Sequence, residues 1–370
     1  MFERLNHAHT HTYTARIPGK LFVAGEYAIL EAGNPAILFA VNQYLSCRVA
    51  TNSVANTIEL SSDLPELTPL QFKRNEPIPT HAQWRYVLSA IQVVEDLITT
   101  WQQPLRCYRL HFATELIDEH GAKYGFGSSG AVTVATIKAL FYFYGIEIQS
   151  PETLFKLAAI ALTRMGTTGS LADIAVNCYG GWVFYRSLDR QWLAKQLACH
   201  VPIETLLTCA WPCLTIESLA APTNLQIHIG WTTSPASTDQ HVQSFHTQKE
   251  KHPALYQQFI KDSADAVHRM KSAFDQQDVA QLQQALTDAR HLLLTLDQTY
   301  NLSIETPALK HLINLAEQHG FVAKSSGAGG GDCGIAFGYQ SQNNAPLLQA
   351  WREAGIIPLS LGIAPSQINE

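Results

Sequence analysis

The first part of the chain shows the alternation of apolar and polar positions that is typical of strands. Alternation at 13–17, an apolar run at 21–26 and further runs at 36–50 and 57–61 predict a strand-rich beginning. Residues 62–80 are punctuated by prolines and are expected to form a loop. The remaining elements are predicted from changes in the spacing of apolar residues along the chain.

Helical spacing of apolar residues appears first between residues 81 and 101, and a strand pattern follows at 105–116. Ser150 and Pro151 have the residue types of a helix cap and a first helical position, so a helix is expected to begin there. The same patterns predict helices at 128–144, 152–165, 253–275, 278–298 and 305–319, strands at 181–185, 225–231 and 333–338, and a final helix and strand.

The order of these elements predicts an α+β fold in two domains. Both halves begin with strands and continue with mixed elements, which disfavours a doubly wound parallel sheet. Residues 205–220 are poor in charge and rich in breakers, so we place the boundary there. The predicted domains are 1–218 and 219–370. The length of 370 residues agrees with two domains of roughly 150 residues each.

Composition narrows the class of partner. The chain is 46% hydrophobic and 15% charged, which is enough apolar material for a large core. Its 25 basic and 31 acidic residues give a formal net charge of −6. This balance lacks the basic field of a nucleic-acid binder or a polybasic membrane binder, so we expect neither partner. Any bound anion must therefore meet local cations and backbone amides.

The seven cysteines are scattered and contain no C-x-x-C pair, which predicts free thiols in a reducing compartment. The first residues show no apolar signal core, and the most apolar helix candidate, at 130–146, carries Lys138. We therefore expect a soluble, cytoplasmic protein without a membrane span.

Residues 125–130 read GFGSSG, which matches the pattern G-x-G-x-x-G. One interpretation is a dinucleotide site, which needs a strand running straight into the first glycine and an acidic residue about 20 positions later. Glu147 supplies the acid, but the polar residues 117–124 separate the predicted strand from the loop. The context therefore counts against a dinucleotide.

A phosphate-donor site is the second interpretation of this loop. Ser128 and Ser129 open the predicted helix, whose amino end carries a partial positive charge suited to phosphate. Lys123 adds a cation just upstream, and a serine hydroxyl can bind Mg²⁺ beside a nucleotide. On its own, the loop is equally compatible with an ordinary glycine-rich turn. The surrounding motifs must decide.

Four motifs occur in order: PGKLFVAGEYA at 18–28, KYGFGSSG at 123–130, GSLADIA at 169–175 and KSSGAGGGDCG at 324–334. Together they resemble the motifs of the GHMP kinases, a superfamily of small-molecule kinases. These segments and IGWTTSPAST at 229–238 are most similar to phosphomevalonate kinases. The resemblance covers about residues 14–340, and four ordered motifs are far more specific than one.

This resemblance implies a fold, ligands and a reaction. The fold is an N-terminal domain similar to ribosomal S5 domain 2 and a ferredoxin-like C-terminal domain, with the site between them. The implied cofactors are ATP and Mg²⁺, and the implied acceptor is phosphomevalonate. The alternatives are another GHMP kinase, acting on mevalonate or a sugar, and a catalytically silent GHMP-like ligand sensor. Oligomeric state is left open by the sequence.

The resemblance also implies roles for individual residues. Lys20 and Asp173 match the catalytic lysine and aspartate, and Ser129 matches a Mg²⁺ contact. The implied ATP-phosphate contacts are Lys123, Gly125, Gly127, Ser128, Ser129, Gly130 and Ser170. The implied acceptor contacts are Ser234, Ser237, Ser326, Gly327, Ala328 and Gly329.

Two positions depart from the family pattern. Mevalonate kinases carry a glutamate Mg²⁺ ligand 11 residues before the motif aspartate, and this chain has Leu162 there. This disfavours mevalonate kinase. Ala172 stands where the family has glycine. Arg85, Arg164 and Lys324 remain open as candidates for holding the acceptor's phosphate.

The implied acceptor decides the chemistry expected of Asp173. A hydroxyl acceptor would need Asp173 as a general base. A phosphate monoester has a second pKa of about 6 and needs no proton removed at neutral pH. We therefore expect Lys20 to bridge the acceptor and the γ-phosphate, while Asp173 orients Lys20 and helps to hold the metal ion.

Overall fold

The computed structural model describes residues 1–5, 12–234, 245 and 247–367, and in these residues it contains two large sheets and a two-stranded sheet of β1 with β7. The larger sheet has the strand order β5–β4–β6–β3–β8–β9, with β2 also paired to β3. Its pairs are antiparallel except for β4 with β6. Its strands are β2 (Thr12–Ala24), β3 (Pro35–Thr51), β4 (Thr57–Ser62), β5 (Leu70–Lys73), β6 (Tyr108–Thr114), β8 (Trp182–Arg186) and β9 (Thr215–Leu219).

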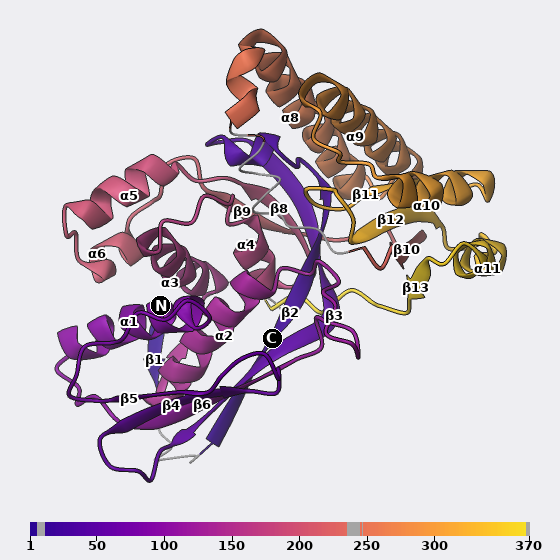
Figure 1. Cartoon of the computed structure of the whole chain (residues 1–370). Helices are drawn as coiled ribbons and strands as arrows, with labels where there is room; N and C mark the ends of the chain where they lie inside the picture. Colours follow the sequence, from indigo (N-terminus) through magenta and orange to yellow (C-terminus); the bar gives the residue numbers. More distant parts are fainter. Residues whose placement is uncertain (6–11, 235–244, 246, 368–370) are drawn as a thin grey trace.

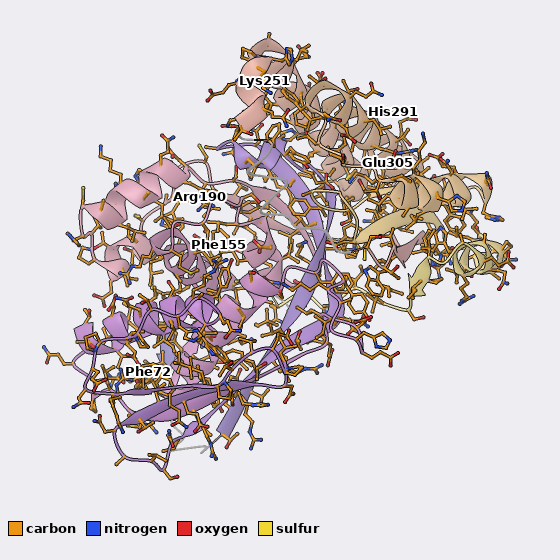
Figure 2. The ribbon with its side chains drawn as sticks, in the orientation of Figure 1. Phe72, Phe155, Arg190, Lys251, His291 and Glu305 are labelled. Atoms are coloured by element: carbon orange, nitrogen blue, oxygen red, sulfur yellow. The ribbon has the colours of Figure 1, made fainter. Side chains whose placement is uncertain are left out.

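The first group of helices gathers on one side of this sheet (Figure 1). The central one, α2, is apolar around almost its whole circumference, because it packs between β2 and β3 on one side and other helices on the other. Figure 2 shows side chains, Phe155 among them, filling the space between these helices. The helices are α1 (Arg85–Thr100), α2 (Ser128–Phe143), α3 (Pro151–Arg164), α4 (Ala172–Tyr179), α5 (Arg190–Ala198) and α6 (Ile203–Thr208).

The smaller sheet belongs to the second part of the chain and is antiparallel, in the order β11–β12–β10–β13. Its helices lie at the opposite end of the molecule from α1 and α6 (Figure 1). The strands are β10 (Leu225–Trp231), β11 (Val322–Ser325), β12 (Cys333–Tyr339) and β13 (Ile357–Leu359). The helices are α8 (Pro253–Asp275), α9 (Val279–Tyr300), α10 (Pro307–Gln318) and α11 (Ala345–Glu353). Short elements complete the set: β1 (Phe2–Arg4), β7 (Ile146–Ile148), η1 (Ala28–Leu30) and η2 (Lys249–Lys251).

The α+β architecture predicted from the sequence is confirmed, and the long helices and strands lie where their periodicity placed them. The expectation of a loop over 62–80 is wrong in part, because β5 pairs with β4 inside it. The periodicity of the sequence did not predict α4, α5, α6 or β9. These elements are short, and β9 lies within the stretch read as a boundary.

The chain passes from the larger sheet to the smaller one and then returns to the larger sheet at its C-terminal end. β9 still pairs with β8 in the larger sheet, and β10 begins the smaller one. The C-terminal residues then return to the larger sheet, where the Ala364 N–H donates to the carbonyl of Ala40. The division into 1–218 and 219–370 stays a prediction.

Two further expectations concern the environment of the chain. Its cysteines are all free thiols in the structure. Across the described residues, no helix combines the length and the apolar character that crossing a bilayer requires. The predicted cytoplasmic location stays a prediction.

Candidate active site

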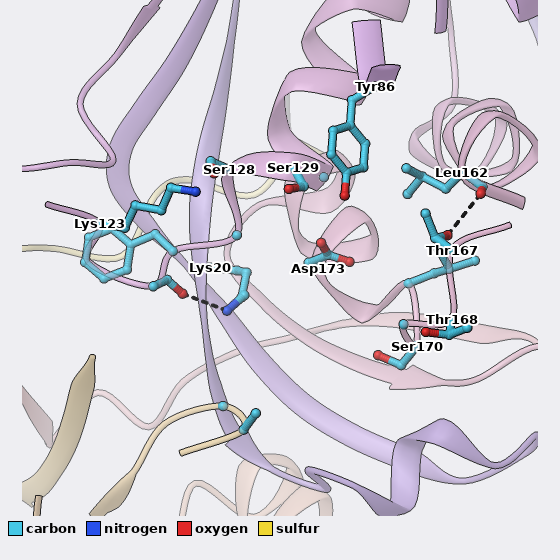
Figure 3. Close-up of a pocket in the computed structure, with 18 of the residues that line it drawn as sticks. Lys20, Tyr86, Lys123, Ser128, Ser129, Leu162, Thr167, Thr168, Ser170 and Asp173 are labelled. Atoms are coloured by element: carbon cyan, nitrogen blue, oxygen red, sulfur yellow. Dashed lines mark hydrogen bonds between the residues drawn. The ribbon is translucent and has the colours of Figure 1, made fainter. Parts of the chain in front are cut away.

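A cleft of about 560 Å³ opens between the two halves of the chain. Figure 3 shows Lys20, Lys123, Ser128, Ser129 and Asp173 converging on it from different elements. Its lining comes from β2, the start of α1, the loop before α2 and the first turn of α2, the end of α3 with the loop from 165 to 171, the start of α4 and the loop between β11 and β12. The cleft therefore brings together all four motifs found in the sequence.

The amino end of α2 faces this cleft without a side-chain cap. Gly127 precedes the helix with a φ of +76°, and no side chain accepts a hydrogen bond from the first turn. The first N–H groups of a helix have no partner inside the helix. With the hydroxyls of Ser128 and Ser129 beside them, they form an electropositive pocket suited to phosphate.

Lys20 reaches this pocket from the opposite wall. Its ammonium donates a hydrogen bond to the carbonyl of Gly125 at 2.9 Å, and its backbone N–H donates to the carbonyl of Phe126 at 3.0 Å. A β-bulge between Pro18 and Gly19 shifts the register of β2 just before this contact. The strand and the phosphate loop are thus held together by backbone and side chain alike.

Burial lowers the pKa of the Lys20 ammonium below its ordinary value, and the nearby carboxylates, Asp173 first, oppose the shift. Burial correspondingly raises the pKa of Asp173, with the Lys20 ammonium as the main opposing influence. The two groups therefore stabilise each other's charged forms in a partly desolvated site.

Asp173 stands in the first turn of α4 and packs on the glycines of the phosphate loop. A Cβ on Gly127 would lie 2.9 Å from Cε of Lys20 and 3.6 Å from Cβ of Asp173. A Cβ on Gly130 would lie 2.6 Å from Oδ2 of Asp173. Glycine is required at these positions because Lys20 and Asp173 occupy the space that a side chain would fill.

The loop before α4 forms a further wall, and Ser170 lies on it as predicted. Two side-chain hydrogen bonds to backbone carbonyls hold this loop in place. The Tyr185 hydroxyl donates to the carbonyl of Ser170 at 2.9 Å, and the guanidinium of Arg190 donates to the carbonyl of Thr167. Arg190 was missed from the sequence, because its role depends on a contact with a loop that lies in a different part of the chain.

The C-terminal glycine loop contributes Gly327 and Ala328 to the cleft, as predicted. Ser326 and Gly329 lie behind this wall. The Ser326 hydroxyl donates to the carbonyl of Phe22 at 2.9 Å, and a Cβ on Gly329 would collide with the backbone of Ile304. Both therefore shape the loop from behind.

The serine loop at 232–238 is only partly described. Ser234 is exposed and accepts a hydrogen bond from the Asp332 N–H at 2.8 Å through its carbonyl, and it is not among the residues that line the cleft. Ser237 lies outside the described residues. The acceptor roles that the resemblance implies for these two serines stay predictions.

Two of the three cations left open by the sequence are committed elsewhere. Lys324 is fully buried and pairs with Glu26, with 2.5 Å between Nζ and Oε1. Arg164 pairs with Asp96 at 2.7 Å. Arg85 lines the cleft next to Tyr86, whose hydroxyl points into it (Figure 3).

Protein ligands for a metal ion are few among the described residues of the cleft. Within the described residues, no group of three acidic, histidine or cysteine side chains is arranged to hold a metal ion. Leu162 lines the cleft with an aliphatic side chain at the position where mevalonate kinases carry their glutamate. Ser129 is exposed at the start of α2 and offers a hydroxyl oxygen.

Comparisons with known proteins agree with this geometry. The family model described as GHMP kinases N terminal domain matches residues 85–181, and the one described as GHMP kinases C terminal matches residues 270–357. The chain is 37% identical to the phosphomevalonate kinase of Streptomyces sp. (strain CL190) over 364 residues, covering 95% of this chain and 96% of that enzyme.

Two solved structures are similar over nearly their whole length. One is a protein from Listeria innocua, with a TM-score of 0.88 and 35% identity, covering 96% of this chain and 99% of that one. The other is Streptococcus pneumoniae phosphomevalonate kinase in complex with phosphomevalonate and AMPPNP. It has a TM-score of 0.84 and 29% identity, and covers 95% of this chain and 99% of that one.

Proposed function

The chain belongs to the GHMP kinases and within them to the phosphomevalonate kinases, and on this basis we propose that it transfers the γ-phosphoryl group of ATP to phosphomevalonate, giving diphosphomevalonate and ADP. The observation that carries this proposal is the single cleft shared by the Lys20 ammonium and the uncapped start of α2. A site that joins two phosphorylated molecules needs positive groups on both sides of the transferred phosphoryl group, and this cleft has them.

ATP binds with its phosphates at the start of α2. The free N–H groups of the first turn and the hydroxyls of Ser128 and Ser129 supply hydrogen bonds, and Lys123 supplies charge. Ser170 lies on the facing wall. Gly125, Gly127 and Gly130 let the backbone approach Lys20, Asp173 and Asp332 closely.

Mg²⁺ fits a site of this composition. The ion prefers oxygen ligands, keeps several waters and shares substrate phosphates instead of requiring a full protein cage. Ser129 would hold it from the protein side. When bound, it would neutralise charge on the phosphates of the nucleotide.

The residues of this chain then supply position and charge. The acceptor phosphate is already largely dianionic at neutral pH, so no general base is needed. Lys20 lies between the two phosphates and lowers their repulsion, while Asp173 holds Lys20 in its charged form. Gly327 and Ala328 close the acceptor side. Of the three cations that the sequence left open for the acceptor's phosphate, Arg85 is the one that lines the cleft.

A coupled assay of ADP formation tests this function with mevalonate, phosphomevalonate and diphosphomevalonate side by side. We expect turnover that is dominated by phosphomevalonate. Preferred turnover of mevalonate would instead identify a mevalonate kinase, and absence of ADP with every acceptor would identify a silent ligand sensor. Lys20→Ala serves as the matched inactive control for contaminating kinases.

A further inference from the structure

Asp332 brings a second carboxylate into the cleft, from the C-terminal glycine loop. Its backbone is held on both sides in a left-handed conformation with a φ of +55°. Its N–H donates to the carbonyl of Ser234 at 2.8 Å, and its carbonyl accepts hydrogen bonds from the N–H and hydroxyl of Thr232, both at 2.9 Å. The carboxylate is therefore carried on a fixed piece of backbone.

The Asp332 side chain meets the phosphate loop at Gly125. A Cβ on Gly125 would lie 2.6 Å from Cγ of Asp332, so the carboxylate occupies the space that a side chain would fill. The carbonyl of the same glycine accepts the hydrogen bond from the Lys20 ammonium at 2.9 Å. Gly125 is thus flanked by the Lys20 ammonium from one half of the molecule and the Asp332 carboxylate from the other.

A carboxylate at this place repels the phosphates that the cleft is proposed to bind, at a cost that grows as water is excluded. It therefore needs an offsetting role, and the charges around Lys20 indicate one. The groups whose charges act on the pKa of the ammonium are Asp173 on α4, Asp332 on the C-terminal glycine loop, the Cys333 thiol at the start of β12, and Glu26 after β2. Lys123 on the phosphate loop lines the same cleft.

We propose that Asp332 is a positioning residue for the phosphoryl transfer, which keeps the Lys20 ammonium charged and directed at Gly125. The inference rests on the function proposed above. Burial lowers the pKa of Lys20, and the carboxylates of Asp173 and Asp332 oppose this shift.

Competitive labelling of lysines with acetic anhydride at a series of pH values, quantified by mass spectrometry, tests the proposal without using activity. We expect the pH midpoint of Lys20 acetylation to fall by about one pH unit in Asp332→Asn, since removal of a nearby opposite charge lowers the pKa of an ammonium by about that much. Asp332→Glu retains the charge and should restore most of the shift. Asp96→Asn, an exposed carboxylate paired with Arg164, is the matched control and should leave the midpoint unchanged.

A second measurement separates positioning from a structural role. The alkaline limb of kcat/KM for phosphomevalonate should move to lower pH in Asp332→Asn, with activity partly recovered at lower pH. An unchanged pH midpoint of Lys20 acetylation overturns the proposal, and so does an equal loss of activity at every pH. An increased Mg²⁺ requirement without any change in the Lys20 midpoint also overturns it. If Asp332→Asn fails to fold, Asp332→Ser provides the same neutralisation.

The same two measurements distinguish a failure of this proposal from a failure of the proposed function. A shifted Lys20 midpoint in an enzyme whose wild type does not turn over phosphomevalonate would refute the acceptor and leave the electrostatic role of Asp332 standing.

Discussion

Gly130 on α2 lies directly against the carboxylate of Asp173 on α4. A Cβ added to Gly130 would come within 2.6 Å of Oδ2 and 3.0 Å of Cγ of Asp173. The carboxylate is thereby held at the first turn of α2, beside the positive end of that helix. This contact joins the first turn of α2 to the Asp173 carboxylate, which in turn opposes the loss of charge on Lys20.

Gly130→Ala should therefore displace Asp173 and weaken catalysis without preventing folding. We expect kcat to fall about 100-fold, the size of effect that a displacement near 1 Å produces in a positioned site. Steady-state kinetics with both substrates, together with a thermal melt, checks this. An alanine variant with wild-type kcat would show that the position of Asp173 does not limit the reaction.

Lys20 and Asp173 should differ in how much their loss costs. Lys20→Ala removes the cation between two phosphates, and we expect a loss of turnover on the order of 10³-fold or more. Asp173→Asn should be milder, because the acceptor has no proton to remove and Asp173 acts through Lys20. Turnover measured at saturating substrates distinguishes these cases. Equal losses would support base catalysis by Asp173.

The pH dependence of kcat/KM should show an early alkaline limb. The required form of Lys20 is the charged one, and burial lowers its pKa, so activity falls as the pH rises through that lowered value. Lys20→Arg should remove this limb, since a guanidinium stays charged across the range. Retention of the limb in Lys20→Arg would assign it to another group.

The acid limb has two contributions. Burial raises the pKa of Asp173, so its ionised form is lost at a higher pH than for an ordinary aspartate as the pH falls. The acceptor's phosphate also takes up a proton at a pH of about 6. Asp173→Asn should leave only the second contribution.

The buried pair of Lys324 and Glu26 should stabilise the contact between the two halves. Lys324→Met leaves the Glu26 carboxylate buried without its cation, which should cost about 3–5 kcal/mol in the free energy of unfolding. The double variant Glu26→Gln with Lys324→Met should recover most of this loss. Urea denaturation measures both. Additive losses in the double variant would show that the pair is not coupled.

Much of the fold followed from periodicity, and much of the site from motif order. The cleft is lined by Lys20, Asp173, the two serines of α2 and Ala328, and each of these residues belongs to one of the four ordered motifs. The site roles themselves stay predictions until variants are measured. The position of Leu162 in the lining agrees with the sequence argument against a mevalonate kinase.

Other features depended on contacts distant in sequence. The ion pair of Lys324 joins residues 298 positions apart, so no local pattern could have shown that it is buried and unavailable to a ligand. Arg190, on α5, gains its role only through its contact with the loop before α4. Asp332 gains its role only where its loop meets Gly125. Short elements such as α4 were missed because one or two turns carry too little periodicity.

Phosphorus NMR of the wild-type enzyme mixed with ATP, Mg²⁺ and phosphomevalonate tests the central claim, that one cleft joins two phosphorylated molecules. We predict that the acceptor's single phosphate resonance is replaced by two mutually coupled signals of a new diphosphate, which grow at the same rate as the ADP signals. ADP accompanied only by inorganic phosphate, with the acceptor signal intact, would contradict it.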